Sequence, residues 1–222
     1  MPVAANMMAS RKLLVINPNI NAAVTQQVRL AARACAAPGT ALDVVNPDRG
    51  PLAIETPEDR AAAVPHVLGL IQRSSRHDGY ILACFDDIAI VAARAMLSVP
   101  VISMAEAGIR AAARQYDRFD VVTTVNAAVP TITALIAAYG MAGRCQVRAT
   151  GIGVSETAAA TAGAEQALEA TISLSLKAGA GAIVLGSGAY AGRRQKLSGA
   201  FDMPFIDGLE AAIAFCEAAA VR

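Results

Sequence analysis

The sequence predicts an α/β protein built from two similar lobes, each a parallel four-stranded sheet flanked by helices, with the active site in the cleft between them. Two observations carry this prediction. The chain repeats itself once, at a spacing of about 104 residues, and short apolar segments alternate with helical ones in both halves. Strands that are apolar on both faces and separated by helices are typical of parallel sheets covered on both sides.

The duplication consists of three pairs of matching segments that occur in the same order in both halves. The pairs are 14–24 (LVINPNINAAV) with 119–129 (FDVVTTVNAAV), 79–84 (GYILAC) with 182–187 (AIVLGS), and 99–106 (VPVISMAE) with 203–210 (MPFIDGLE). Two lobes that share one sequence pattern are expected to be related by a pseudo-twofold axis. We therefore predict a disordered leader over residues 1–11, one lobe over 12–117 and a second over 118–222, whose last helix can pack back on the first lobe.

Each element follows from local patterns. Apolar runs that end at Pro, Gly or Asn predict strands, and apolar residues at helical spacing predict the helices between them. The first half is expected to contain strands at 12–16, 41–45, 80–84 and 100–103, with helices through 24–35, 58–73, 87–96 and up to about Gln115. The second half repeats this order with strands at 120–124, 146–149, 182–185 and 204–206, and with helices at 130–139, 164–177 and from Leu209 onward.

Composition excludes several classes of function. The net charge is +1 and no Lys/Arg run stands out, whereas a nucleic-acid partner requires a basic stripe that displaces counterions from phosphates. The mean hydropathy is +0.45, but no stretch of about 18 uncharged apolar residues predicts a membrane span. The four cysteines form neither a CxxC pair nor a cluster with histidine, so we expect no metal site and a cytoplasmic protein with reduced thiols.

Two residues occupy equivalent positions in the duplication and are the candidate catalytic pair. Cys84 and Ser187 each end an apolar strand, and ligands of open parallel sheets bind at the carboxyl ends of the strands. A pseudo-twofold axis would place them on opposite sides of one cleft. Such an arrangement suits stereoinversion, in which one group removes a proton and the other returns it from behind. A thiol suits this role because its pKa of about 8.5 is easily lowered at a helix N-terminus, and a helix start is expected after both residues.

A cysteine at a strand end is more often a small buried apolar residue than a functional one. The position of Cys84 in the duplication favours function, whereas Cys35 and Cys216 lie on apolar helix faces and are expected in the core. Asp86 and Asp87 are expected to cap the next helix. The remaining charged candidates are expected outside the chemistry: His66 and His77 outside the cleft, Arg193, Arg194 and Lys196 on a solvated face, and Glu55 and Glu156 either at the cleft mouth or paired with arginines.

An ordered set of short segments resembles the hydantoin and allantoin racemases of the aspartate/glutamate racemase superfamily. The segments are 16–19 (INPN), 50–55 (GPLAIE), 83–87 (ACFDD), 121–124 (VVTT), 184–187 (VLGS) and 204–208 (PFIDG). The resemblance implies a homo-oligomeric racemase that acts on a small molecule without metal, pyridoxal phosphate or other cofactor, using two cysteines as paired acid and base. The first cysteine corresponds to Cys84. The resemblance also implies substrate contacts from Asn17, Phe85, Asp86, Thr123, Thr124, Gly186 and Gly188.

The sequence departs from this family at Ser187, where the second cysteine is expected. A hydroxyl is a poor base without a partner. Three explanations remain open: an engineered Cys-to-Ser change, a natural enzyme that works on one face only, as single-cysteine arylmalonate decarboxylases do, or a loss of catalysis. Two other classes of function also remain. The segment 182–192 (AIVLGSGAYAG) weakly resembles a nucleotide-binding turn, and two lobes around a cleft also describe non-enzymatic proteins that bind a small carboxylate or ureide.

Overall fold

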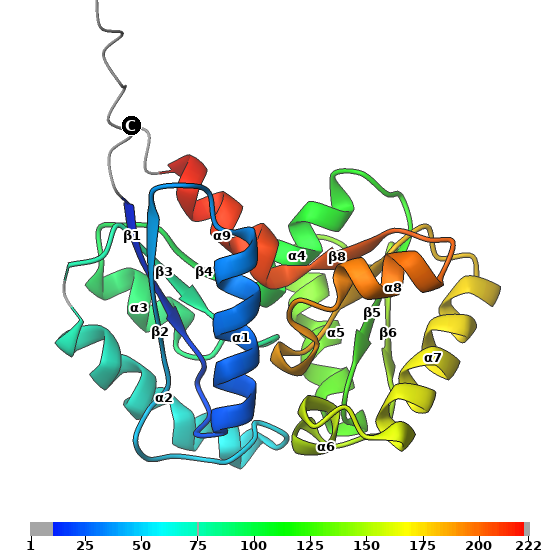
Figure 1. Cartoon of the computed structure of the whole chain (residues 1–222), viewed down its shortest axis with the longest axis horizontal. Coiled ribbons are helices and arrows are strands. Elements are labelled where there is room, and N and C mark those ends of the chain that lie inside the picture. Colours follow the sequence, from blue (N-terminus) through cyan, green and yellow to red (C-terminus); the bar gives the residue numbers. More distant parts are fainter. Residues whose placement is uncertain (1–10, 75, 220–222) are drawn as a thin grey trace, which may run out of the picture.

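Two parallel sheets of four strands form the framework of the chain in the computed structural model, which describes residues 11–74 and 76–219. The first sheet has the order β2-β1-β3-β4 and the second the order β6-β5-β7-β8, so the second half repeats the topology of the first (Figure 1). The strands are β1 (Arg11–Ile16), β2 (Thr40–Val45), β3 (Gly79–Leu82), β4 (Val101–Ser103), β5 (Phe119–Thr123), β6 (Cys145–Ala149), β7 (Ile183–Leu185) and β8 (Phe205–Asp207). The predicted fold class is confirmed. The expected leader lies outside the described residues except for Arg11, which begins β1.

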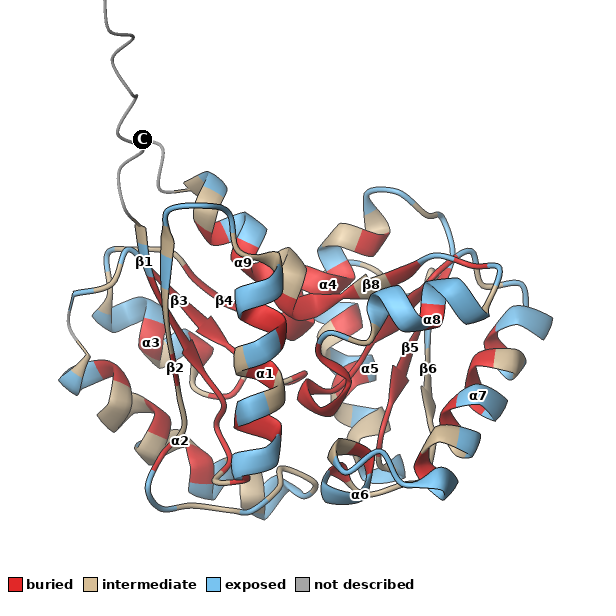
Figure 2. Cartoon of the chain, in the orientation of Figure 1, coloured by how far each residue is buried: buried red, intermediate tan, exposed pale blue. Residues whose placement is uncertain are grey.

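Helices cover both sheets and connect successive strands. They are α1 (Ala22–Cys35), α2 (Pro57–Arg73), α3 (Ile90–Met96), α4 (Met104–Ala113), α5 (Val129–Ala138), α6 (Val154–Ala158), α7 (Ala162–Lys177), α8 (Arg194–Ala200) and α9 (Gly208–Ala219), with 3₁₀ turns η1 (Asn126–Ala128) and η2 (Gly188–Tyr190). The central strands are buried while the outer faces of the helices are exposed (Figure 2). Among the described residues, no helix is both long and apolar enough to cross a bilayer.

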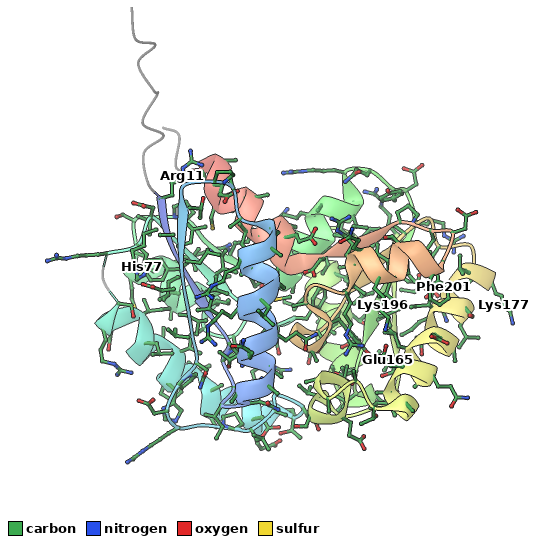
Figure 3. All side chains as sticks on the ribbon, in the orientation of Figure 1. Arg11, His77, Glu165, Lys177, Lys196 and Phe201 are labelled. Atoms are coloured by element: carbon green, nitrogen blue, oxygen red, sulfur yellow. The ribbon has the colours of Figure 1, made fainter. Side chains whose placement is uncertain are left out.

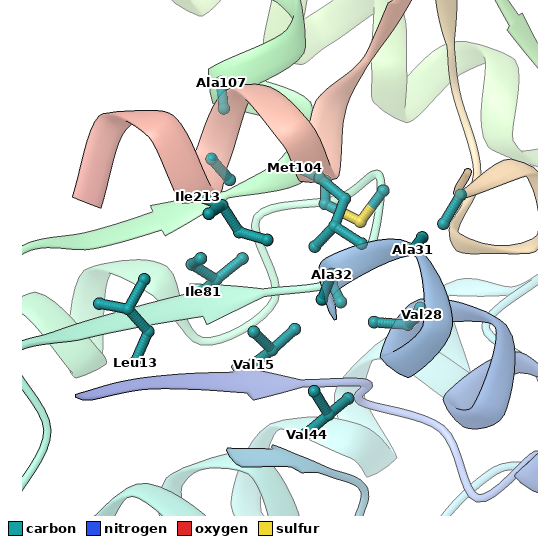
Figure 4. Packing of buried hydrophobic residues seen from close by; sticks show 14 of the residues in the cluster. Leu13, Val15, Val28, Ala31, Ala32, Val44, Ile81, Met104, Ala107 and Ile213 are labelled. Carbon is teal, nitrogen blue, oxygen red and sulfur yellow. The ribbon is translucent and has the colours of Figure 1, made fainter. Parts of the chain in front are cut away.

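Two of the helices are exchanged between the sheets. Helix α9 follows the second sheet, yet Leu209 and Ile213 belong to the apolar cluster that contains Leu13 and Ile81 of the first sheet. Figure 4 shows Ile213 over these strands, with Met104 and Ala107 of α4 nearby. Helix α4 in turn follows the first sheet and contributes Ala105, Ile109 and Ala112 to the cluster of the second sheet.

Glycines let α4 and α9 approach closely at the junction of the lobes. A methyl group on Gly208 would lie 2.4 Å from the Met104 carbonyl oxygen, and one on Gly108 would lie 2.9 Å from Val184 Cγ1. Any side chain there would collide with backbone or core atoms. The exchanged helices and this close approach give the two lobes a shared core, which holds their strand ends in a defined relation.

Candidate active site

A cavity of about 50 Å³ lies between the lobes, next to the carboxyl ends of the strands. Its wall is formed in part by the segments that follow β3 and β7, which carry Cys84 and Ser187. The full lining comprises Asn19, Val24, Ile54, Glu55, Arg60, Ala83, Cys84, Phe85, Asp86, Thr123, Thr124, Ala128, Thr131, Ile132, Val154, Gly186, Ser187, Gly188 and Ala189. All but one of the residues expected at the site therefore line the same cavity.

The turn after β7 touches the end of β3. A methyl group on Gly188 would lie 3.1 Å from the Ala83 carbonyl oxygen and 3.7 Å from Val24 Cγ1. Ala83 and Gly188 are the immediate neighbours of Cys84 and Ser187. The two candidate acid/base residues are thus carried by backbone segments in van der Waals contact, one from each lobe.

The environment of Cys84 favours the neutral thiol. Burial raises the pKa of this thiol above its ordinary value, and the nearby carboxylates of Asp86 and Asp87 raise it further, while the Arg60 guanidinium and the Phe85 N–H lower it. The expected helix start directly after Cys84 is wrong: α3 begins only at Ile90. The N-terminus of α3 is therefore not the source of support for a thiolate that the sequence predicted.

The two aspartates after Cys84 do not cap α3, which is a second correction. Residue Ala89 precedes the helix in a left-handed conformation (φ 60°) without any side-chain cap. Asp86 forms an ion pair with Arg60, and burial raises the pKa of Asp86 despite this partner. Asp87 accepts hydrogen bonds from the hydroxyl groups of Ser103 and Tyr139. Both aspartates therefore fasten the loop after Cys84 to other elements.

Ser187 differs from Cys84 in its surroundings. It precedes η2, and its Oγ accepts a hydrogen bond of 3.2 Å from the Ala189 N–H. Within the described part of the chain, no histidine or carboxylate bonds to this hydroxyl, and the backbone N–H groups of Ser187 and Gly188 donate to no oxygen. Thr123 Oγ1 donates to the Gly186 carbonyl at 2.8 Å, which fixes this strand end. The turn therefore offers N–H donors to a developing negative charge.

Asn17 is the expected site residue that the structure places outside the cavity lining. It is fully buried, and its Nδ2 donates to Asn19 Oδ1 at 2.9 Å and to Thr25 Oγ1 at 3.0 Å. Asn19 lines the cavity instead. The direct contact expected from Asn17 is therefore replaced by an indirect one, because its amide is used to orient Asn19.

Residues that bridge the lobes at the cavity were largely missed by sequence reasoning. Arg60 Nη2 of α2 donates to Thr131 Oγ1 of α5 at 2.9 Å, and Glu55 Oε1 accepts from the Val154 N–H at 2.8 Å. Glu55 was expected either at the cleft mouth or paired with an arginine, and its position in the cavity lining supports the first alternative. Arg60 carries no sequence signal, since an arginine on the first turns of a helix usually faces solvent.

The remaining charged candidates lie elsewhere. His77 Nε2 bonds to Asp43 at 2.9 Å and its Nδ1 to the Ser74 carbonyl at 2.8 Å, away from the cavity. The expected solvated face is wrong for Arg193, whose side chain is only 12% exposed and is paired with Glu165. Lys196 reaches the same carboxylate at 3.1 Å (Figure 3).

Neither a metal centre nor a nucleotide site emerges from this geometry. No group of three or more metal-ligating side chains occurs within residues 11–74 and 76–219. The segment after β7 forms a 3₁₀ turn of three residues, whereas a dinucleotide-binding turn leads directly into an α-helix whose N-terminus binds the pyrophosphate. The cavity lining instead brings together the thiol of Cys84 and the hydroxyl of Ser187, two groups that can exchange protons.

Comparison with known proteins gives a consistent result. Residues 13–216 match the family described as Asp/Glu/Hydantoin racemase. The chain is 35% identical to a hydantoin racemase of Rhizobium meliloti over 92% of its length and 86% of the relative's. It is 31% identical to a hydantoin racemase of Paenarthrobacter aurescens over 93% and 89% of the two chains. An allantoin racemase structure from Klebsiella pneumoniae superposes with a TM-score of 0.90 at 36% identity, covering 94% of this chain and 87% of that one.

Proposed function

The chain belongs to the Asp/Glu/hydantoin racemase family, and we propose that it is a cofactor-independent racemase that inverts the carbon next to a carbonyl in a hydantoin or in allantoin. The relatives are named as racemases of hydantoin and of allantoin. The observation that carries the proposal is that Cys84 and Ser187, from equivalent strand ends of the two lobes, line one cavity. Placed on opposite sides of a ring carbon, they can take a proton from one face and return it to the other.

The reaction proceeds through an enolate. The base removes the proton from the ring carbon, and negative charge develops on the adjacent carbonyl oxygen. The N–H groups of Ser187 and Gly188 stabilise this oxygen, because they have no other oxygen to bond within the described chain. The acid on the opposite face then delivers a proton to the carbon. Thr123, Thr124 and Asn19 hold the amide groups of the ring, with Phe85 and Gly186 shaping the wall.

The raised pKa of Cys84 determines the pH dependence of this step. Because burial keeps the group as a thiol at neutral pH, the thiolate is a minor species whose fraction grows as the pH rises. Proton abstraction by Cys84 should therefore accelerate with increasing pH across the alkaline range. The two carboxylates next to Cys84 act in the same direction as burial, and Arg60 opposes them.

Family membership and the thiol content support three further proposals. The partner is a small molecule, and the assembly is a homo-oligomer, as the family resemblance implies. A cytoplasmic location is supported by the four cysteines, all of which are free thiols.

The direct test is solvent deuterium incorporation at the ring carbon, followed by proton NMR in deuterium oxide with allantoin and 5-substituted hydantoins. Cys84→Ala should reduce enzyme-dependent exchange to the level of the heat-inactivated protein, because no other thiol lines the cavity. Cys145→Ala is the matched control, since it removes a half-buried thiol that is not in the lining, and it should exchange at the parent rate. Undiminished exchange in Cys84→Ala would overturn the assignment.

One observation favours a second candidate, an enzyme that exchanges or removes a group on one face only. Ser187 Oγ bonds only to the Ala189 N–H within the described residues, so no base prepares it for proton transfer. Such an enzyme would incorporate deuterium with retention and would not racemise. Ser187→Cys separates the two functions. If the parent chain works on one face only, its racemisation rate is near zero and the variant gains racemisation. If Cys84 and Ser187 already form a working pair, the parent chain racemises the substrate before the substitution.

A further inference from the structure

We propose that Arg60 is a positioning residue for Cys84, one that ties the Cys84 loop to helix α5 of the other lobe and controls the charge that the thiol experiences. The inference rests on the proposed acid/base role of Cys84. Nothing in the sequence pattern marks Arg60, and it is absent from the set of residues implied by the family resemblance. Its assignment comes from the contacts of its guanidinium group.

The guanidinium group is held from two sides at the cavity wall. Its Nε pairs with the Asp86 carboxylate, and its Nη2 donates to Thr131 Oγ1 at 2.9 Å. Asp86 lies two residues after Cys84, and Cys84, Arg60, Asp86 and Thr131 all line the same cavity. One side chain thus connects α2, the loop after Cys84 and α5, with a fixed positive charge at their junction.

The loop that Arg60 holds is constrained along its length. Ala89 has a left-handed backbone conformation, which costs about 1 kcal/mol or more for a residue with a side chain and persists only where the surroundings enforce it. Asp87 is held by Ser103 of β4 and by Tyr139 at the end of α5. Helix α5 is therefore connected to the Cys84 loop at two consecutive aspartates. Arg60 links it to Asp86, and Tyr139 bonds directly to Asp87.

The charges around the thiol come from few elements. Asp86 and Asp87 lie on its own loop, Arg60 on α2 and Glu55 on the segment before α2. Helix α5 and the segment of Ser187 and η2 contribute only uncharged residues to the cavity lining, with Thr131 and Ser187 as their polar side chains. Among the described residues that line the cavity, Arg60 is thus the only cation, and its effect on the Cys84 thiol opposes that of the carboxylates. When one member of the Arg60–Asp86 ion pair is removed, the charge of the other is no longer compensated and shifts the pKa of the nearby thiol.

The test measures the reactivity of the Cys84 thiol in the absence of substrate, so its outcome does not depend on whether Cys84 is catalytic. The rate of Cys84 alkylation by iodoacetamide is followed against pH by mass spectrometry of the Cys84 peptide, which separates it from the other cysteines. Asp86→Asn leaves the Arg60 charge uncompensated, whereas Arg60→Met leaves the Asp86 charge uncompensated. We expect alkylation at pH 8 to be at least about tenfold faster in Asp86→Asn than in Arg60→Met, the equivalent of about one unit in ionisation midpoint.

Two controls distinguish charge from loop structure. Arg60→Lys keeps the charge and should alkylate near the parent rate, and Tyr139→Phe removes the other α5 tether without changing a charge and should not move the midpoint. Equal rates in Asp86→Asn and Arg60→Met, or a Tyr139→Phe midpoint displaced as far as that of Arg60→Met, would overturn the proposal. Loss of deuterium exchange in Cys84→Ala would still stand in that case. Conversely, the alkylation result holds even if Cys84 proves not to be catalytic.

Discussion

Gly188→Ala tests the apposition of the two strand ends on which the proposed chemistry depends. The added methyl group would lie 3.1 Å from the Ala83 carbonyl oxygen, where carbon and oxygen normally stay a few tenths of an ångström farther apart. The backbone at Gly188 is not in the left-handed region, so the substitution introduces a contact and no backbone strain. Relief requires the segments that carry Cys84 and Ser187 to separate by a few tenths of an ångström.

The expected magnitude is small for stability and larger for catalysis. Overpacking at a mild contact lowers the free energy of unfolding by about 1 kcal/mol. The smaller entropy of the unfolded alanine variant offsets about 0.4–1 kcal/mol of this loss. The Tm should therefore change by less than about 3 °C. A misplacement of about 1 Å can reduce the rate about 100-fold, so a few tenths should reduce kcat/KM for racemisation about three- to tenfold.

The assay is polarimetric racemisation of allantoin together with calorimetric melting of the same samples. Gly163→Ala provides the matched control, because a methyl group there, in the first turn of α7, meets no atom within 4 Å. It should leave kcat/KM unchanged. Full activity in Gly188→Ala at an unchanged Tm would refute the tight apposition, since the added methyl would then have been accommodated without moving either strand end.

Two further predictions concern stability. Burial raises the pKa of Cys35, Cys145 and Cys216 to about 12 from 9.0, so the folded chain retains protons that the unfolded chain loses. The stability that these thiols contribute is therefore fully present at neutral pH, and the Tm should fall as the pH rises from about 9 toward 12. A calorimetric Tm that does not fall between about pH 8 and pH 10.5 would contradict this linkage. Arg193→Met removes a cation whose side chain is 12% exposed, paired with Glu165 and bonded to the Thr157 carbonyl, and should cost about 1–3 kcal/mol. The matched Arg194→Met removes a 45% exposed cation and should cost under about 1 kcal/mol; equal melting temperatures of the two variants would contradict the burial argument.

Much of the fold could be predicted because the same pattern of strands and helices occurs in both halves of the sequence. The apolar runs ending near Cys84 and Ser187 occur at equivalent places, and the two sheets indeed have the same strand order. The short helices α6 and α8 were not predicted: each buries at most two residues, so neither has an apolar stripe that the sequence could show. The packing of α4 on the second sheet was not predicted, because it depends on the close approach of Gly108 to Gly208, and glycine at one helix position does not indicate what packs against it.

The site could be predicted in its residues more than in its contacts. Asn17 and Asn19 are both polar residues of the first turn, and only the fold decides that Asn19 lines the cavity while Asn17 supports it. Asp87 follows a strand and resembles a helix cap, but its hydroxyl partners include Tyr139, 52 residues later in the chain. Partners of that separation leave no local pattern. Arg60 was missed for the same reason, since its partners Asp86 and Thr131 come from two other segments.

The measurement that tests the central claim most directly is the location of deuterium early in the reaction. A single enantiomer of allantoin is incubated with the protein in deuterium oxide, and after about a tenth of the conversion the residual substrate and the product are separated on a chiral phase and analysed by mass spectrometry. Two groups on opposite faces predict deuterium in the product enantiomer and little in the remaining substrate, starting from either enantiomer. Deuterium that accumulates in the recovered substrate as fast as in the product would contradict this account.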